Sequence, residues 1–154
     1  LTRDTNSTPQ SIYPRLTHVN VRRLADDIVA ALAVRLAQKK IDAIVDVPAG
    51  LFFPADEQLL HDAITQLADN ALTAMSCGGE LWITGVHGMS GVEIEIADSG
   101  PGLSAPAELL KAARSDNGGL SLVQRIAEAH GGRAWARNHD EGGAVVGFRI
   151  RAAA

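Results

Sequence analysis

The stretch from residue 56 to residue 75, DEQLLHDAITQLADNALTAM, decides the fold of this chain. Its apolar residues recur at intervals of three and four, which is the spacing of one face of an α-helix. The stripe consists of Leu59, Leu60, Ala63, Ile64, Leu67, Ala71, Leu72 and Met75. Two glycines, Gly78 and Gly79, follow directly. We therefore predict a long amphipathic helix that covers a hydrophobic core.

The same stretch carries a second, polar stripe. It consists of Asp62, Gln66, Asn70 and Thr73, which are spaced by four, four and three residues. Residues at these intervals share one face of a helix. The stripe is either a solvated helix face or one wall of a polar ligand site, and the helix alone favours the solvated face.

Helical and alternating patterns flank this helix on both sides. Upstream we predict a helix over 20–40 with Asn20 as its N-cap, a strand over 41–47 and a loop over 49–55. Downstream we predict strands over 80–87 and 91–97 joined by a turn, a short helical stretch around 108–114, a helix over 119–130 and closing strands over 133–138 and 144–151. This order predicts an α+β fold, a two-layer α/β sandwich with a mixed, mainly antiparallel sheet covered by three helices.

Length and composition indicate one ordinary globular domain. The chain has 154 residues, of which 46% are hydrophobic and 21% charged, values typical of soluble domains. We expect a leader over 1–18, the domain over 19–151 and a tail over 152–154. The formal net charge of −4 argues against nucleic acid as a partner, because phosphate binding usually needs a basic surface. No apolar run approaches the roughly 20 residues of a membrane span, so we expect no direct membrane contact.

A polar, glycine-rich turn follows the strand predicted over 91–97. It reads Asp98-Ser99-Gly100-Pro101-Gly102. A carboxylate at a strand end is well placed to accept a hydrogen bond from an exocyclic amine, and neighbouring glycines let the backbone approach a flat ring. The same residues would also make an ordinary strand-ending turn, so the motif alone leaves both interpretations open.

A third segment, Gly118-Gly119-Leu120, opens the helix predicted over 119–130. Free N–H groups and the dipole at a helix start favour phosphate. Glycines in a loop before a helix are also common without a ligand. The P-loop pattern is absent, and no GxGxxG follows a predicted strand.

In this order and spacing, these segments resemble the GHKL, or Bergerat-fold, ATP-binding family, and most closely the catalytic domain of sensor histidine kinases. The resemblance runs from residue 19 to residue 150. Residues 66–75 are similar to the family's N-box, and 98–102 to its first glycine box, DxGxG. Residues 120–132 are similar to the helix that ends in HGG, and 141–148 to the last glycine box and final strand.

The resemblance implies ATP and Mg²⁺ as cofactors and assigns roles to single residues. Asn70 would coordinate the Mg²⁺ that bridges the ATP phosphates, and Asp98 would bind the adenine amino group. Gln66 would occupy the catalytic position of the N-box. The remaining nucleotide-binding positions would be Thr73, Gly100, Gly102, Gly118, Gly119 and Leu120.

The chain departs from the family pattern mainly where phosphates would lie. Gln66 stands where sensor kinases usually carry Asn, and Thr73 where many carry a cation. Of the family's GxGLGL only Gly119 and Leu120 remain in register, and the lid over 102–118 is short and lacks a phenylalanine pair. Ala144 replaces a common threonine. Two cations in the lid, Lys111 and Arg114, would either compensate in part or lie solvated at the surface.

The function implied is transfer of the ATP γ-phosphoryl group to a histidine on a separate dimerisation domain, with a response regulator as the next partner. Neither His18 nor His61 fits the phospho-accepting motif, so a homodimer is expected only through upstream helices. The chain does not begin with Met, and we expect a C-terminal piece of a longer protein. The location implied is cytoplasmic, in a cytosolic kinase or as the cytosolic part of a membrane-bound receptor.

Three alternatives remain open. The first is a degenerate, non-catalytic GHKL signalling module with weak or no nucleotide binding, which the reduced lid favours. The second is a serine kinase of the anti-sigma type, which would need a carboxylate where this chain has Gln66. The third treats every motif as a turn or a helix face, which the ordered co-occurrence disfavours.

Overall fold

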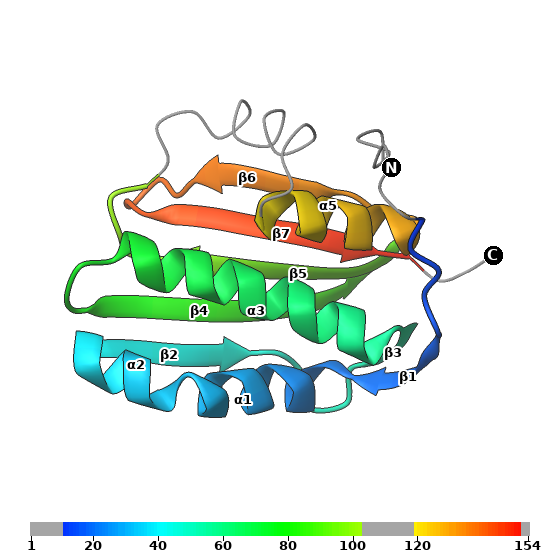
Figure 1. Ribbon diagram of the computed structural model, residues 1–154, viewed down its shortest axis with the longest axis horizontal. Coiled ribbons are helices and arrows are strands. Elements are labelled where there is room, and N and C mark those ends of the chain that lie inside the picture. The colour runs from blue at the N-terminus through cyan, green and yellow to red at the C-terminus, as the bar shows by residue number, and fades with distance from the viewer. Residues whose placement is uncertain (1–10, 103–118, 152–154) are drawn as a thin grey trace, which may run out of the picture.

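A five-stranded β-sheet with helices on one face forms the main body of the chain (Figure 1), described by a computed structural model over residues 11–102 and 119–151. The strands are β2 Ile41–Asp46, β4 Gly79–Gly88, β5 Gly91–Asp98, β6 Ala134–Asn138 and β7 Ala144–Ile150. Their order is β2-β4-β5-β7-β6. The β2–β4 pair is parallel, and the other three pairs are antiparallel. The predicted α+β fold with a mixed, mainly antiparallel sheet is confirmed.

The helical layer lies in front of the sheet in Figure 1. The helices that it contains are α1 Val21–Ala31, α2 Ala33–Lys39, α3 Glu57–Ala74 and α5 Gly119–Ala129. The single helix predicted over 20–40 is divided at Leu32, which takes φ −95° and ψ 3°. Apolar spacing continues through this break, because Leu32 and Leu36 are both buried. The stretch predicted around 108–114 lies outside the described residues.

Both ends of α3 are capped by groups from the chain. Asp56 is the N-cap, and its Oδ1 accepts a hydrogen bond from the main-chain N–H of Leu59 at 3.1 Å. At the other end, Nζ of Lys39 donates to the main-chain oxygen of Met75 at 2.9 Å and to that of Leu72. A cation at a helix C-terminus also interacts favourably with the helix dipole. These caps fix where the polar stripe of α3 begins and ends.

A small two-stranded sheet corrects one prediction. The loop predicted over 49–55 is wrong over its second half, because β3 Phe52–Ala55 pairs antiparallel with β1 Thr17–Asn20. The alternate residues Phe53 and Ala55 are buried. Strand β1 begins at Thr17, two residues before the domain boundary expected at residue 19. The predicted N-cap Asn20 is confirmed, since its Oδ1 accepts from the N–H of Arg23 at 3.1 Å.

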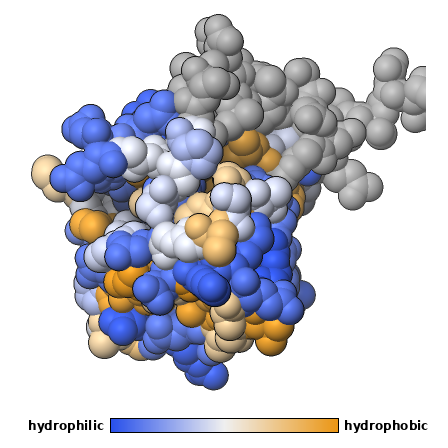
Figure 2. All heavy atoms as spheres, turned by 90° about the vertical axis from the view of Figure 1, so that its left-hand side faces the viewer, coloured by the Kyte–Doolittle hydropathy of each residue, from blue (hydrophilic) through white to orange (hydrophobic). Residues whose placement is uncertain are grey.

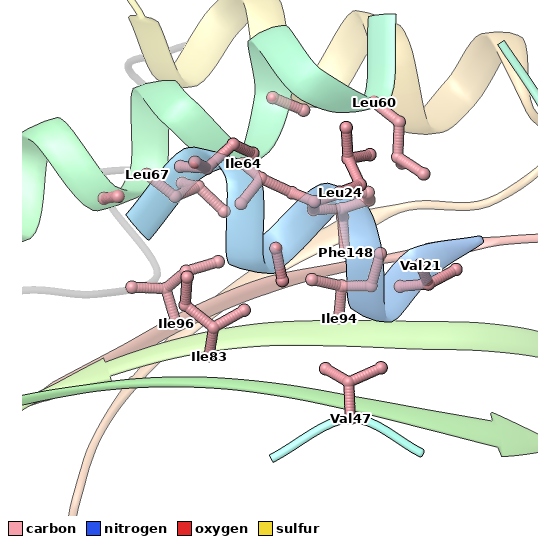
Figure 3. Packing of buried hydrophobic residues seen from close by; sticks show 14 of the residues in the cluster. Val21, Leu24, Val47, Leu60, Ile64, Leu67, Ile83, Ile94, Ile96 and Phe148 are labelled. Carbon is pink, nitrogen blue, oxygen red and sulfur yellow. The ribbon is translucent and has the colours of Figure 1, made fainter. Parts of the chain in front are cut away.

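The core lies between α3 and the sheet. Figure 3 shows Ile64 and Leu67 of α3 above Ile94 and Ile96 of the sheet, with Phe148 beside them. All five are at most 2% exposed. Burying one such side chain contributes about 1.5–3 kcal/mol relative to leaving it in water. The predicted apolar stripe of α3 therefore holds the helix against the strand that ends at residue 98.

A buried histidine ties the helical layer together. His130 is 6% exposed. Its Nδ1 lies 2.8 Å from the main-chain oxygen of Ile126, and its Nε2 lies 3.1 Å from the main-chain nitrogen of Asp56. Because that N–H donates, Nε2 is the acceptor, and Nδ1 faces the main-chain oxygen of Ile126 as the donor. The His130-Gly131-Gly132 motif therefore joins the end of α5 to the start of α3.

Acidification is expected to remove part of this capping energy. Partial burial raises the pKa of the Asp56 carboxyl, but the main-chain N–H groups of Arg15 and Leu59 lower it, and the net pKa is below its ordinary value. A lowered folded-state pKa contributes stability above the unfolded pKa of about 3.9, and this stability is lost as pH falls through the folded value. Urea unfolding should therefore show Asp56→Asn less stable than wild type at neutral pH, with the gap closing at acid pH as the Asp56 carboxyl is protonated in the folded state. An equal gap at both pH values would contradict this assignment.

Candidate functional site

A pocket of about 240 Å³ opens at the end of the sheet where β5 finishes. Figure 2 shows this end of the molecule, where hydrophobic residues lie in small groups among hydrophilic ones. Four elements supply its walls, namely α3, α5, the end of β5 and the start of β7. The lining residues are Leu67, Asn70, Ala71, Ala74, Ile96, Asp98, Gly102, Leu120, Ala144 and Val146.

Asp98 is the last residue of β5 and the one acidic group among the described lining residues. Its Oδ1 accepts hydrogen bonds from the main-chain N–H of Gly100 at 2.9 Å and of Ala144 at 3.3 Å. No described residue donates to Oδ2. Two fixed donors on one oxygen hold the carboxylate in a single orientation, so the second oxygen is free to accept from a ligand.

Glycines keep the backbone close to Asp98. A Cβ at Gly100 would come within 3.0 Å of Oδ1 of Asp98 and 3.1 Å of Cγ of Met75. Gly143, in the turn between β6 and β7, has φ +92°, and a Cβ there would lie 1.8 Å from the main-chain oxygen of Asp98. Only glycine fits such a left-handed, crowded position. The last glycine motif of the sequence therefore packs directly on the first.

Asn70 lies at the rim of the pocket and is exposed. Its Oδ1 accepts a hydrogen bond from Nε2 of Gln66, one turn earlier on α3, at 3.1 Å. This bond uses one lone pair of the Asn70 oxygen and leaves the other free. It also leaves Oε1 of Gln66 unused among the described residues. The two amides thus offer neutral oxygen atoms beside the pocket.

The other predicted nucleotide-binding residues differ in whether they line the pocket. Gly102 and Leu120 line the pocket, and Gly119 is the first residue of α5. Thr73 does not line it, because its hydroxyl donates to the main-chain oxygen of Asp69 at 2.9 Å. Such a bond back to the preceding turn is common for threonine in helices. Gly118, Lys111 and Arg114 lie outside the described residues.

Several wall residues were missed by the sequence reasoning. They are Leu67, Ala71, Ala74, Ile96, Ala144 and Val146, all apolar. A signal was available, because the three from α3 follow the spacing of four and three beside Asn70. Ile96 lies two residues before Asp98 and therefore on the same face of β5.

The lining chemistry suits a flat, uncharged ring with one amine donor. Most of the wall is aliphatic, and one carboxylate oxygen points from the polar edge. No lysine or arginine lines the pocket within 11–102 and 119–151. Its volume lies below the roughly 300 Å³ of pockets that enclose a whole drug-sized ligand, so the described part fits a base better than a complete nucleotide.

Comparison with known sequences identifies relatives of this chain. The family described as histidine kinase-, DNA gyrase B-, and HSP90-like ATPase matches residues 55–154. The chain is 32% identical over 134 residues to an adaptive-response sensory kinase SasA of Crocosphaera subtropica, covering 77% of this chain and 35% of that protein. It is 30% identical over 146 residues to the C4-dicarboxylate transport sensor protein DctB of Pseudomonas aeruginosa, covering 86% and 24%. The chain thus spans about a third or less of these curated relatives.

Solved structures share the fold. The catalytic domain of histidine kinase ThkA superposes with a TM-score of 0.80 at 25% identity, covering 89% of this chain and 95% of that one. Full-length ShkA, solved in complex with AMPPNP, superposes with a TM-score of 0.78 at 26% identity, covering 94% and 33%. Both matches include the layers that build the pocket, since they cover nearly all of this chain.

Within 11–102 and 119–151, no helix has the length and apolar character needed to span a membrane. The family match includes Asn70 and Asp98, which line the pocket, and the motif at 130–132, which joins α5 to the start of α3. It covers 100 of the 154 residues. The chain therefore belongs to the family of histidine kinase-, DNA gyrase B- and HSP90-like ATPases, and it has the fold of the ATP-binding catalytic domain of sensor histidine kinases.

Proposed function

We propose that this chain binds ATP with Mg²⁺ and serves in the transfer of the γ-phosphoryl group to a histidine on a separate helical dimerisation domain. The observation that carries the nucleotide site is the fixed orientation of Asp98, which lines a mostly aliphatic pocket while its Oδ1 is held by two main-chain donors. A carboxylate in this setting accepts from the amino group of adenine and disfavours bases that present a carbonyl there.

The donor atoms beside the pocket fit Mg²⁺. This ion prefers hard oxygen ligands and usually takes only one or two from protein, with phosphates and waters completing the octahedron. Asn70 would hold it through Oδ1, with Oε1 of Gln66 within the same polar pair. Bound there, Mg²⁺ would neutralise charge on the phosphates.

The residues of the chain contribute positioning in this proposal. Asp98 and the aliphatic walls orient the base. Gln66 keeps the Asn70 amide turned toward the rim, and the start of α5 at Gly119 offers main-chain N–H groups toward the phosphates. Phosphoryl transfer depends mainly on such positioning and on charge stabilisation. The acceptor histidine would come from outside this segment.

A second candidate function is a non-catalytic nucleotide-binding or partner-binding module. It is favoured by the phosphate side of the site, where Thr73 bonds to its own helix and no described lysine or arginine lines the pocket. The two candidates separate when the domain is mixed with a phospho-accepting helical domain and labelled ATP. Labelled histidine supports the kinase, whereas binding of ATP analogue without any transfer supports the module.

The direct test is calorimetric titration with a non-hydrolysable ATP analogue and Mg²⁺. Saturable binding supports the proposed site. The absence of binding up to an analogue concentration of about 1 mM, the weak end of specific affinities, would contradict the nucleotide proposal for this domain.

Replacing Asn70 should affect binding only when Mg²⁺ is present. We expect Asn70→Ala to weaken the analogue by about tenfold with Mg²⁺, as for the loss of one metal ligand or its positioning partner, and to leave the affinity in EDTA unchanged. Gln58→Ala is the matched control, because Gln58 makes the same type of bond to Asp62 at 2.9 Å near the start of α3. Equal losses with Mg²⁺ and with EDTA would contradict the metal role of Asn70.

The proposal extends to the surroundings of the domain. Residues 19–151 would form the ATP-binding unit of a longer cytoplasmic or membrane-attached kinase, with 1–18 and 152–154 as flanking segments. The crystal structure of histidine kinase ThkA in complex with the response regulator protein TrrA supports a response regulator as partner. Dimerisation would come from helices outside this segment.

A further inference from the structure

The face of the sheet opposite the helices carries both tryptophans of the chain. In Figure 1 all labelled helices lie on the near side, so no described helix covers the far side of the five strands, which we call the open face. Trp82 of β4 alternates with the buried Leu81 and Ile83 and therefore points to this open face. Trp135 of β6 stands opposite Gly147 of β7, and its ring lies 3.1 Å from the Cβ position of that glycine.

Aromatic residues are scarce in this chain, which makes their location informative. The chain has two Trp, three Phe and one Tyr. Phe53 and Phe148 are buried in the core. The two largest rings, Trp82 and Trp135, instead lie on the face of the sheet opposite the helices. Trp82 is 38% exposed. Tryptophan is enriched at the centres of protein interfaces, and exposed Trp is otherwise costly to keep.

The strand register builds an apolar row through Trp82. Ile44 of β2 pairs with Trp82, Trp82 with Ala97 of β5, and Ala97 with Val145 of β7. These residues and Trp82 therefore lie side by side across four strands of the open face. A groove of about 440 Å³ runs over Trp82, Ala97 and Val145 of this row.

Carboxylates surround the row. Three acidic residues of the groove, Glu80, Glu95 and Glu141, belong to this surface, and the fourth, Asp98, also lines the nucleotide pocket. The one arginine among its described lining residues, Arg137, lies 3.5 Å from Glu95 and is neutralised by it. On the β2 side, Asp42 pairs in register with Glu80 and Asp46 with Thr84, so both stand beside the row. Neither Asp42 nor Asp46 forms an ion pair with any described residue.

The indoles are held in place by the same acids. Nε1 of Trp82 donates to Oε2 of Glu80 at 2.9 Å, and Nε1 of Trp135 donates to Oε2 of Glu95 at 2.9 Å. Each ring is thereby held with its Nε1 edge on a carboxylate, and Trp82 remains exposed. A cation over such a face gains both cation–π attraction and a nearby negative charge.

From this arrangement we infer that the open face of the sheet is a docking surface for a basic segment of a partner protein, which places an arginine or lysine side chain over Trp82 in the groove. The apolar row receives the aliphatic stem of that side chain, and the carboxylates at the rim receive its charge. Among their described lining residues, the groove and the nucleotide pocket share only Asp98, and Trp82 and Glu80 lie on the face of the sheet opposite the helices. The inference therefore does not depend on the proposed kinase activity.

A synthetic amphipathic peptide of leucine, lysine and arginine serves as the probe, with a glutamate version of the same length as its negative control. Calorimetry and tryptophan emission are recorded at ~0.15 M salt, where charges more than about 8 Å apart are largely screened. Because both tryptophans lie on the open face, saturation with the basic peptide should change their emission and protect them from a soluble quencher. The glutamate peptide should not bind.

Matched variants distinguish specific binding at the open face from non-specific attraction by the net negative charge of the domain. Trp82→Ala is expected to weaken the basic peptide by roughly tenfold, as for an aromatic anchor, while Trp82→Phe retains most of the affinity and shows that the strand still folds. Asp42→Asn with Asp46→Asn should weaken it severalfold. Asp26→Asn with Asp27→Asn on α1 removes the same charge from the helical layer and should have little effect.

Three outcomes would overturn the inference. The first is binding without a change in tryptophan emission, which would locate the peptide elsewhere. The second is an equal loss in the two aspartate double variants, which would reduce the effect to net charge. The third is a dimer in sedimentation that Trp82→Ala dissociates, which would assign the face to a second copy of the chain.

Discussion

Replacing Asp98 with asparagine is expected to lower the affinity for an ATP analogue by about 100-fold. Oδ1 of Asp98 accepts from the N–H groups of Gly100 and Ala144. In the variant these donors orient the amide oxygen toward themselves, so its NH₂ group faces the pocket. A donor then meets the amino group of adenine. Losing a charge-assisted hydrogen bond and gaining an unpaired donor costs about 3 kcal/mol, and each 1.4 kcal/mol is tenfold in affinity.

The same geometry predicts a change of base preference. Hypoxanthine presents a carbonyl where adenine presents its amino group, and the inward NH₂ of Asp98→Asn can donate to it. The ratio of ATP to inosine triphosphate affinities should therefore fall further than the ATP affinity alone, because the affinity for inosine triphosphate rises. Calorimetry with both analogues on both proteins measures this ratio. Asp46→Asn, on the open face of β2, removes the same charge far from the pocket and should change neither value.

Unchanged ATP affinity in Asp98→Asn would refute the assignment of the base site. The free energy of unfolding of Asp98→Asn should equal that of wild type, because the asparagine oxygen keeps both main-chain contacts. A loss of ATP binding accompanied by equal loss of stability would instead point to a structural role for Asp98.

The long helix and the hairpin after it could be predicted because their patterns are local. The apolar stripe of α3 and the alternation over 91–97 each specify a buried face within one element. Asn70 and Asp98 could also be placed together in advance, since the family resemblance supplied a contact that no local pattern contains. In the structure both line one pocket.

The two-stranded sheet could not be predicted for a physical reason. Its strands have four residues each, they are 31 residues apart between Asn20 and Phe52, and Pro54 interrupts the second. Their stability comes from long-range pairing and from packing of Val19 and Phe53 in the core, not from local propensity. The break at Leu32 was missed because apolar spacing continues through it.

The direction in which a side chain points could not be predicted from the sequence either. Thr73 shares the polar stripe with Asn70, but its hydroxyl bonds back to Asp69 instead of entering the pocket. Helical spacing states which face a residue occupies and does not state which competing partner its hydroxyl takes. The aliphatic walls were missed for a similar reason, because an apolar residue that lines a pocket looks like one that fills a core.

A single methyl group at Gly143 is expected to damage both the fold and the base site. Gly143 has φ +92°, and its added Cβ would lie 1.8 Å from the main-chain oxygen of Asp98 and 3.1 Å from Cα of Ser99. Contacts this short force the turn between β6 and β7 away from the end of β5. Left-handed strain costs about 1 kcal/mol or more, and the displacement adds to it. We expect Gly143→Ala to lose about 3 kcal/mol of unfolding free energy.

The neighbouring glycine is a close control for this effect. Gly142 has φ +100°, but a Cβ there meets nothing within 4 Å. Gly142→Ala should therefore carry only the backbone strain, about 1 kcal/mol, and should bind the ATP analogue almost normally. In Gly143→Ala the N–H of Ala144 moves with the turn, so Asp98 loses one of its two fixed donors and the affinity should fall at least tenfold. Chemical unfolding and calorimetry on both variants measure the two effects, and equal behaviour of the pair would show that crowding against Asp98 does not build the site.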